Sequence, residues 1–142
     1  MAANILVVDD SGTMRGMIKR TIAMSGLDIG EVYEAANGIE ALSQMYEHQI
    51  SVILLDINMP VMNGVKLLTR MRDDKRLRDI PVIIASTEGS ETRIGELMRA
   101  GARGYVRKPF RPEQLRDVLT PLIGPGRAVS STAADNFDTV SF

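Results

Sequence analysis

The sequence predicts an α/β domain, a doubly wound parallel sheet of five strands with five helices. Two observations predict this class. Short apolar runs rich in β-branched residues alternate along the chain with longer segments whose apolar residues recur at helical spacing. The alternation is strict and occurs five times, as expected when a helix crosses over from each parallel strand to the next.

Five segments are strand candidates. The runs Ile5–Val8, Val52–Leu55 and Pro81–Ala85 contain no polar residue, which is typical of parallel strands that are covered on both faces. Weaker strands fit Glu31–Ala35 and Gly104–Arg107, where charged residues stand among the apolar ones. We expect all five to belong to one parallel sheet.

Apolar stripes between the strands predict the helices. The stripes are Met14, Met17, Ile18 and Ile22; Ile39, Leu42 and Met45; Val65, Leu68 and Met71; Ile94, Leu97 and Met98; and Leu115, Val118, Leu119 and Leu122. Asn37 with Glu40 three residues later resembles a capping box at the start of the second helix. Ser90 is a candidate cap for the fourth helix, and Pro112 suits the first turn of the fifth.

The alternating pattern ends at Gly124. The sequence Gly124-Pro125-Gly126 breaks the last helix, so we predict one domain over residues 1–123 and a tail over residues 124–142. The tail carries Phe137 and Phe142, two of the three phenylalanines of the chain, and a purely solvating tail is usually poorer in aromatic residues. We expect this tail to be flexible or to dock through Phe137, Val140 and Phe142, on this domain or on a partner.

Composition excludes several classes of function. The 142 residues contain no cysteine and a single histidine, His48, which excludes thiol catalysis, zinc fingers and any site with several histidines. The 17 basic and 18 acidic residues give a net charge of −1, which does not favour nucleic acid as a partner. Because no leader or membrane span is recognisable either, we expect a cytoplasmic protein without a membrane partner.

Polar residues follow the predicted strands at the points where each strand ends. Asp9 and Asp10 follow the first strand and Asp56 the third, while Ser86 and Lys108 follow the fourth and fifth. Ligands of open parallel sheets bind at the carboxyl ends of the strands, so these side chains should converge. Three neighbouring carboxylates repel one another unless a cation compensates them, and oxygen ligands favour Mg²⁺, with Mn²⁺ as a second choice. An ammonium and a hydroxyl beside them suit a phosphoryl group carried by a carboxylate.

The spacing of these residues resembles that of the response-regulator receiver domains over about residues 4–123. Asp9-Asp10, Asp56-Ile57-Asn58-Met59-Pro60, Asn63-Gly64, Ser86 and Lys108-Pro109-Phe110 carry the resemblance. It implies a flavodoxin-like sheet in the order 2-1-3-4-5. The stretch Asp10–Arg15 and the lack of a recognisable output domain make the chain most similar to the stand-alone chemotaxis regulators of that family.

The resemblance also implies roles for individual residues. Asp56 would accept a phosphoryl group from a histidine kinase or a phosphotransfer protein, and Ser86 and Lys108 would hold the phosphoryl oxygens. The Mg²⁺ ligands would be Asp9 through water, Asp10, Asp56 and the carbonyl of Asn58. Such a protein catalyses its own phosphorylation and dephosphorylation but is not a turnover enzyme.

The family resemblance also implies how phosphorylation is passed on to a downstream protein. Tyr105 would be the switch aromatic that moves when Ser86 is drawn to the phosphoryl group. The downstream protein would bind the fourth helix, fifth strand and fifth helix around Thr92, Arg99, Tyr105 and Arg116. The phosphoryl lifetime would depend on Asn58, Thr87 and Glu88, and a phosphatase is a possible further partner. In this family the Lys108–Pro109 peptide bond is usually cis.

Two alternatives remain open. The chain could be the receiver piece of a longer regulator, with Gly124 at the start of a linker. Asp9-Asp10-Ser11-Gly12-Thr13 also partly resembles the first motif of haloacid-dehalogenase-type phosphatases, with Asp9 as nucleophile. Those phosphatases have a second aspartate where this chain has Ser11, so this match is incomplete.

Overall fold

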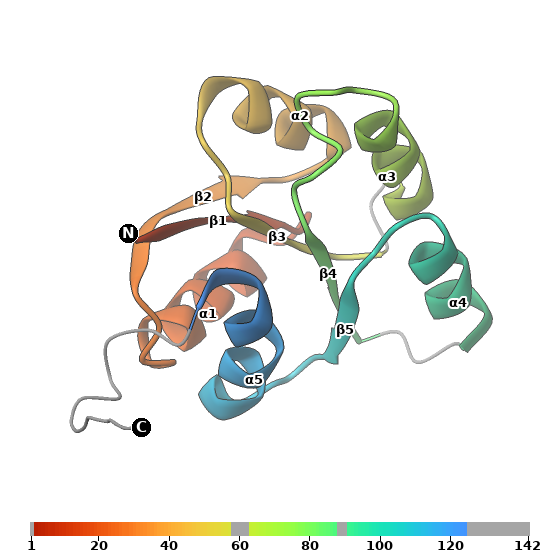
Figure 1. Cartoon of the computed structure of the whole chain (residues 1–142). Helices are drawn as coiled ribbons and strands as arrows, with labels where there is room; N and C mark the ends of the chain where they lie inside the picture. Colours follow the sequence, from red (N-terminus) through yellow and green to blue (C-terminus); the bar gives the residue numbers. More distant parts are fainter. Residues whose placement is uncertain (1, 58–62, 88–90, 125–142) are drawn as a thin grey trace.

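Five parallel strands form one sheet in the order β2-β1-β3-β4-β5 in the computed structural model, which describes residues 2–57, 63–87 and 91–124 (Figure 1). The strands are β1 (Ala3–Val8), β2 (Ile29–Ala35), β3 (Val52–Leu55), β4 (Val82–Ser86) and β5 (Gly104–Arg107). The helices are α1 (Gly12–Ala23), α2 (Gly38–Glu47), α3 (Gly64–Arg72), α4 (Glu91–Arg99) and α5 (Pro112–Ile123). The fold class and the strand order are confirmed.

The helices cover both faces of the sheet. Helices α1 and α5 lie on one face, and α2, α3 and α4 lie on the other (Figure 1). Successive side chains of a strand point to opposite faces, so Ile5 and Val7 of β1 join the core under α1 and α5. Leu6 and Val8 join the core under the other three helices.

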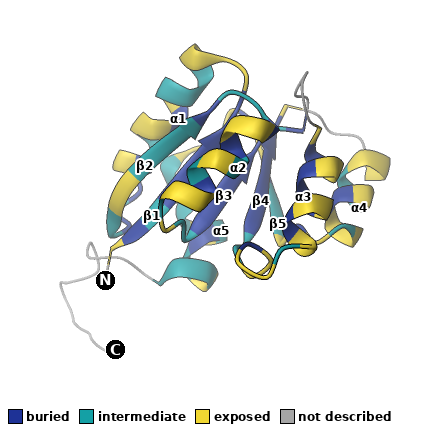
Figure 2. Cartoon of the chain, turned by 90° about the horizontal axis from the view of Figure 1, so that it is seen from above, coloured by how far each residue is buried: buried dark blue, intermediate teal, exposed yellow. Residues whose placement is uncertain are grey.

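Burial explains why three strands were clearer in the sequence than two. Strands β3 and β4 are buried throughout, as is β1 apart from Asn4, and these are the three uninterrupted apolar runs. Strands β2 and β5 lie at the edges of the sheet and are partly exposed, so charged residues are tolerated there. Figure 2 shows the contrast between buried strands and the exposed outer sides of the helices.

The strand register brings the carboxyl ends of the strands together. Val8 of β1 pairs with Ala35 of β2 and with Leu55 of β3, and Leu55 in turn pairs with Ile84 of β4. Ser86, at the end of β4, pairs with Arg107 of β5. The residues that follow these pairs therefore share one edge of the sheet.

The residues at the start of α2 satisfy free N–H groups near the first turn of the helix. The Asn37 side chain accepts a hydrogen bond from the N–H of Glu40 and caps α2, as predicted. The Glu40 carboxylate accepts from the N–H of Ala36, one residue before the cap, and not from Asn37 as a capping box would require. The predicted cap Ser90 lies outside the described residues.

Helix α5 ends at Ile123, and the next residue has a left-handed backbone. Gly124 has φ +95°, a conformation that glycine adopts without steric cost, so this residue stops the helix as the sequence predicts. Within the residues that the structure describes, none of the helices is long and apolar enough to cross a membrane.

Candidate functional site

Asp9 is fixed from three directions at the end of β1. Its N–H donates to the carbonyl of Ala35 at 3.0 Å, and its Oδ1 accepts from the N–H of Ser11 at 2.9 Å. Its Oδ2 forms an ion pair with Nζ of Lys108. With only 2% of its surface exposed, Asp9 is a buried charge with a cationic partner, as a buried carboxylate requires.

Lys108 connects two of the carboxylates. Its Nζ contacts Asp9 and lies 3.9 Å from Oδ1 of Asp56, and the residue is buried. Its N–H donates to the carbonyl of Ser86 at 2.9 Å, which holds the end of β5 against the end of β4. The Lys108–Pro109 peptide bond is cis, as the family resemblance implied.

Asp9, Asp10 and Asp56 form a cluster of oxygen donors. One carboxylate oxygen from each lies within 4.8 Å of the others. Asp9 is buried, Asp56 is partly buried and Asp10 is exposed, so the cluster opens to solvent on one side. This donor set fits Mg²⁺, because Mg²⁺ takes oxygen ligands and keeps several of its waters.

The Tyr105 side chain approaches Ser86 at the carboxyl end of β4. Ser86 is fully buried, and the Tyr105 hydroxyl lies 3.5 Å from the Ser86 carbonyl, at the outer limit of a hydrogen bond. Tyr105 is half-buried and packs against the core on the side of α2, α3 and α4. The Tyr105 side chain thus reaches the backbone of Ser86, and the role of the two residues as a switch stays a prediction. Asn58 and Glu88 lie outside the described residues.

Thr87 is exposed at the entrance to the site. It lines a small pocket of about 120 Å³ whose walls are otherwise mostly apolar side chains, among them Met14, Met17, Pro109 and Phe110. The pocket also touches Lys108. Thr87 thus shares a pocket with the buried lysine, and its influence on access to the site stays a prediction.

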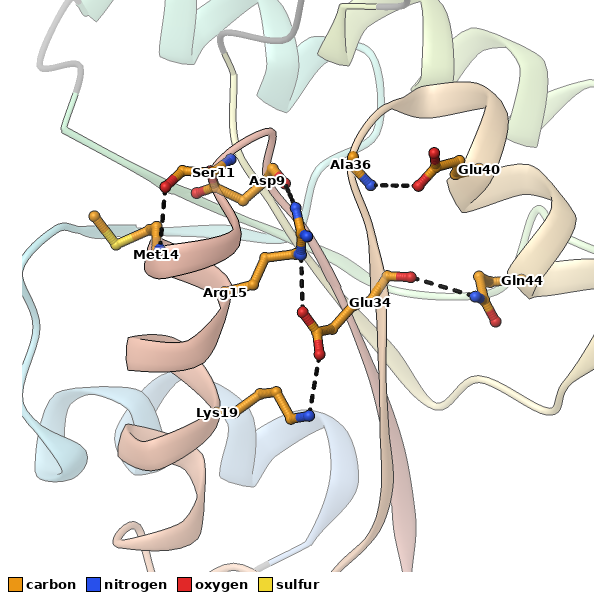
Figure 3. A network of polar contacts seen from close by, with 9 residues as sticks. All are labelled: Asp9, Ser11, Met14, Arg15, Lys19, Glu34, Ala36, Glu40 and Gln44. Atoms are coloured by element: carbon orange, nitrogen blue, oxygen red, sulfur yellow. Dashed lines mark hydrogen bonds and ion pairs between the residues drawn. The ribbon is translucent and has the colours of Figure 1, made fainter.

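Three further residues, Arg15, Lys19 and Glu34, form an ion-pair network that reaches Asp9, and sequence reasoning missed it (Figure 3). Arg15 of α1 donates from Nη1 to the Asp9 carbonyl at 2.7 Å, and its Nε lies 2.8 Å from Oε1 of Glu34. Lys19, one turn further along α1, lies 3.1 Å from Oε2 of Glu34. The hydrogen bond from Arg15, followed by that from Lys19, holds the pKa of Glu34 below its ordinary value. The only sequence signal was two cations four residues apart.

The predicted output surface is assembled in part. Thr92 and Arg99 are exposed on α4, and Tyr105 is half-buried on β5. Arg116 of α5 is directed elsewhere, since its guanidinium donates to the carbonyl of Ser25 at 3.4 Å in the segment between α1 and β2. Arg116 therefore extends toward the opposite flank of α5 from α4.

The fold and the site together define a class of protein. A five-stranded parallel sheet with an aspartate cluster and a buried lysine at its carboxyl edge is the arrangement expected of a receiver domain. A family model described as the response regulator receiver domain matches residues 5–120. The chain belongs to this family.

Among curated proteins, the chain is similar to chemotaxis proteins. The chain is 39% identical over 123 residues to the chemotaxis protein CheY homolog of Campylobacter jejuni, covering 86% of this chain and 93% of that protein. It is 39% identical over 121 residues to the chemotaxis protein CheY1 of Helicobacter pylori, covering 84% of this chain and 96% of that protein.

Solved structures agree in fold. The chemotaxis protein CheY4 of Vibrio cholerae superimposes with a TM-score of 0.76 at 35% identity, covering 86% of this chain and 99% of that one. The receiver domain of the sensor histidine kinase PA1611 from Pseudomonas aeruginosa has a TM-score of 0.75 at 24% identity, with coverages of 87% and 98%. That structure has a magnesium ion coordinated in its active site cleft.

Proposed function

We propose that this chain is a single-domain response regulator that accepts a phosphoryl group on Asp56 and acts in chemotaxis or motility. The observation that carries the proposal is the position of Asp56. Its carboxylate lies beside those of Asp9 and Asp10 and 3.9 Å from the ammonium of Lys108. The names of the relatives support the chemotaxis role, and the matches cover 93% and 96% of those proteins.

Asp56 is better suited to act as the nucleophile than Asp9. The Asp56 side chain is 12% exposed, against 3% for Asp9. Both Asp9 oxygens are also engaged, one by Lys108 and the other by the Ser11 N–H. A phosphohistidine on a partner can reach Asp56 more readily, which disfavours a haloacid-dehalogenase-like reaction on Asp9.

In the proposed reaction an oxygen of Asp56 attacks the phosphorus of the phosphohistidine. The bond between phosphorus and the imidazole nitrogen breaks as the acyl phosphate forms. Lys108 stabilises the negative charge of the phosphoryl oxygens, and the Ser86 hydroxyl donates to one of them. Mg²⁺ held by Asp10, Asp56, the Asn58 carbonyl and, through water, Asp9 would neutralise the charge that gathers between the carboxylates and the phosphoryl group. Mn²⁺ could replace it.

Phosphorylation would be read out through Ser86 and Tyr105. When the Ser86 hydroxyl turns toward the phosphoryl group, the space near Tyr105 changes and the surface of α4, β5 and α5 with it. The proposed phosphodonor is a histidine kinase or a phosphotransfer protein. The proposed downstream partner is a cytoplasmic protein that binds this surface. The side chains of Asn58, Thr87 and Glu88 would set the lifetime of the signal, with or without a phosphatase.

Incorporation of labelled phosphate from acetyl phosphate tests the function. The full chain should take up about one phosphoryl group when Mg²⁺ is present and none in a chelator, because the carboxylate cluster requires a cation. Asp56→Asn should abolish uptake, and Asp79→Asn, which removes an exposed carboxylate far from the cluster in the sequence, should leave it unchanged. Uptake that is independent of Mg²⁺ or retained by Asp56→Asn would contradict the proposal.

A further inference from the structure

An open pocket of about 470 Å³ lies between α2 and the segment that follows α3. Its lining residues are Leu42, Tyr46, Arg70, Asp73, Asp74 and Lys75. Leu42 and the ring of Tyr46 supply apolar surface, and Tyr46 is 45% exposed although it is a large aromatic residue. We call this pocket the α2–α3 groove.

Tyr46 is held in a fixed position within the groove. Its hydroxyl donates to Oδ2 of Asp74, and the guanidinium of Arg76 lies 4.5 Å from the centre of its ring. Asp74 also accepts from the N–H of Arg76 at 2.8 Å through its other oxygen. Both oxygens of Asp74 are therefore occupied, and one face of the Tyr46 ring is covered by a cation.

The lining of the groove carries two cations, Arg70 and Lys75, and two carboxylates, Asp73 and Asp74, and the guanidinium of Arg76 lies over the Tyr46 ring. Residues 66–78 contain six basic side chains and two aspartates. Among the described residues, none of Arg70, Lys75 and Arg76 has a carboxylate oxygen within the 4.0 Å of an ion pair. An occupant with an apolar side chain between two negative charges would pack against Leu42 and Tyr46 and pair with Arg70 and Lys75.

The chain itself carries such a segment beyond α5. Asp135, Phe137 and Asp138 place an aromatic side chain between two carboxylates, with Val140 and Phe142 close behind. Residues 128–142 contain no basic residue. The two carboxylates of this segment can pair with Arg70 and Lys75, and its aromatic side chain can pack against Leu42 and Tyr46.

The segment begins on the correct edge of the molecule. Leu122 and Ile123 at the end of α5 line one pocket together with Gln49, Ile50 and Ser51, which follow α2 within four residues. The chain therefore leaves α5 beside the segment that joins α2 to β3, two to four residues after the end of α2. The eleven Cα-to-Cα steps from Gly124 to Asp135 span at most about 40 Å when extended, which is more than the diameter of about 30 Å of a small domain.

We propose that residues 135–138 dock into the α2–α3 groove of the same molecule, with Phe137 against Leu42 and Tyr46 and the two aspartates against Arg70 and Lys75. The contact needs neither the phosphoryl group nor the metal, so it stands independently of the proposed function. A short tether gives the docking segment a local concentration in the millimolar range, so a weak contact suffices to occupy the groove.

Paramagnetic broadening of amide signals tests this contact. The chain has no cysteine, so Ser141→Cys accepts a single spin label in the full-length protein. With no phosphodonor or metal added, the label should selectively broaden the amide signals of residues 42–47 and 70–77. A mixture of spin-labelled unenriched protein with unlabelled ¹⁵N protein should show no such broadening, because the contact is within one molecule.

Variants of the full chain supply the controls. Arg70→Glu with Lys75→Glu should abolish the selective broadening, and adding Asp135→Lys with Asp138→Lys should restore it. Arg20→Glu with Arg103→Glu makes the same change of charge at exposed positions outside the groove and should have no effect. If the double charge reversal loses its dispersed amide spectrum, Arg70→Gln with Lys75→Gln replaces it.

Four results would overturn the proposal. Uniform or absent broadening would show that the segment does not dock, and broadening centred on other residues would place it elsewhere. Broadening of the groove in the mixed sample at the same strength would assign the contact to a second copy of the chain. If the amide signals of the groove are still broadened in Phe137→Ser, the Phe137 side chain is not part of the contact.

Discussion

At the scale of single residues, the site is a balance of charges around one buried lysine. Lys108 pairs with Asp9 and lies near Asp56, and the exposed carboxylate of Asp10 adds a further negative charge. The convergence of these side chains was predictable, because every one of them follows a parallel strand and parallel strands end at one edge. Their graded burial was not predictable from the sequence.

Removing one charge should stabilise the protein without metal. We expect Asp10→Asn to raise the free energy of unfolding in chelator by roughly 0.5 kcal/mol, a small effect because Asp10 is exposed and water screens its repulsion. Thermal unfolding of the two proteins measures it. Added Mg²⁺ should reverse the order, because the variant lacks a ligand. A variant that melts below the wild type in chelator would place the carboxylates farther apart than described.

The pairing of Arg15 with Glu34 shows where prediction from sequence stopped. Arg15 is on α1 and Glu34 is on the edge strand β2, so their contact depends on how the helix lies across the sheet. The periodicity of the sequence identifies the helix and the strand but not the side chains that meet between them. The link from Arg15 to the Asp9 carbonyl was missed for the same reason.

At the scale of elements, the links between α1 and β2 should make the stability dependent on pH. Because Arg15 and Lys19 lower the pKa of Glu34, its ionised form stabilises the fold. This contribution is present above the unfolded value of about 4.5 and is lost as the pH falls below it toward the lower folded value. Glu34→Gln should therefore lower the melting temperature at neutral pH and have a smaller effect near pH 3.

The neighbouring Glu31 is the matched control for that experiment. It is exposed on the same strand, and none of the ion pairs within the described residues includes it. Glu31→Gln should leave the pH profile of melting close to that of the wild type. Equal profiles for the Glu34 and Glu31 variants would mean that the contacts of Arg15 and Lys19 contribute no net stability.

Element boundaries were predicted best where burial was greatest. Strand β3 matches its predicted bounds, because the buried run Val52–Leu55 has polar neighbours on both sides. Strand β2 begins at Ile29, two residues before its predicted start, since exposed edge residues such as Gly30 leave no apolar pattern. Strand β4 begins at Val82 and not at Pro81, which has no N–H to donate to a neighbouring strand.

At the scale of the whole molecule, the strand order came from family resemblance and not from local pattern. Alternating strands and helices predict a parallel sheet, but nothing in a single strand states which neighbour it takes. The net charge of −1 likewise conceals six basic residues within residues 66–78, and the fold places two of them, Arg70 and Lys75, in one pocket with Leu42 and Tyr46 of α2. Long-range placement is thus the part that the sequence alone left open.

Locating the acyl phosphate in the sequence tests the proposed function most directly. The full chain is treated with acetyl phosphate and Mg²⁺ and then with borohydride, which reduces an aspartyl phosphate to homoserine, and the modified residue is located by peptide mass spectrometry. We expect homoserine at position 56, because the carboxylate of Asp56 is more accessible than that of Asp9 and also lies beside Lys108. Homoserine at position 9 would contradict it and would favour a nucleophile of the haloacid-dehalogenase type.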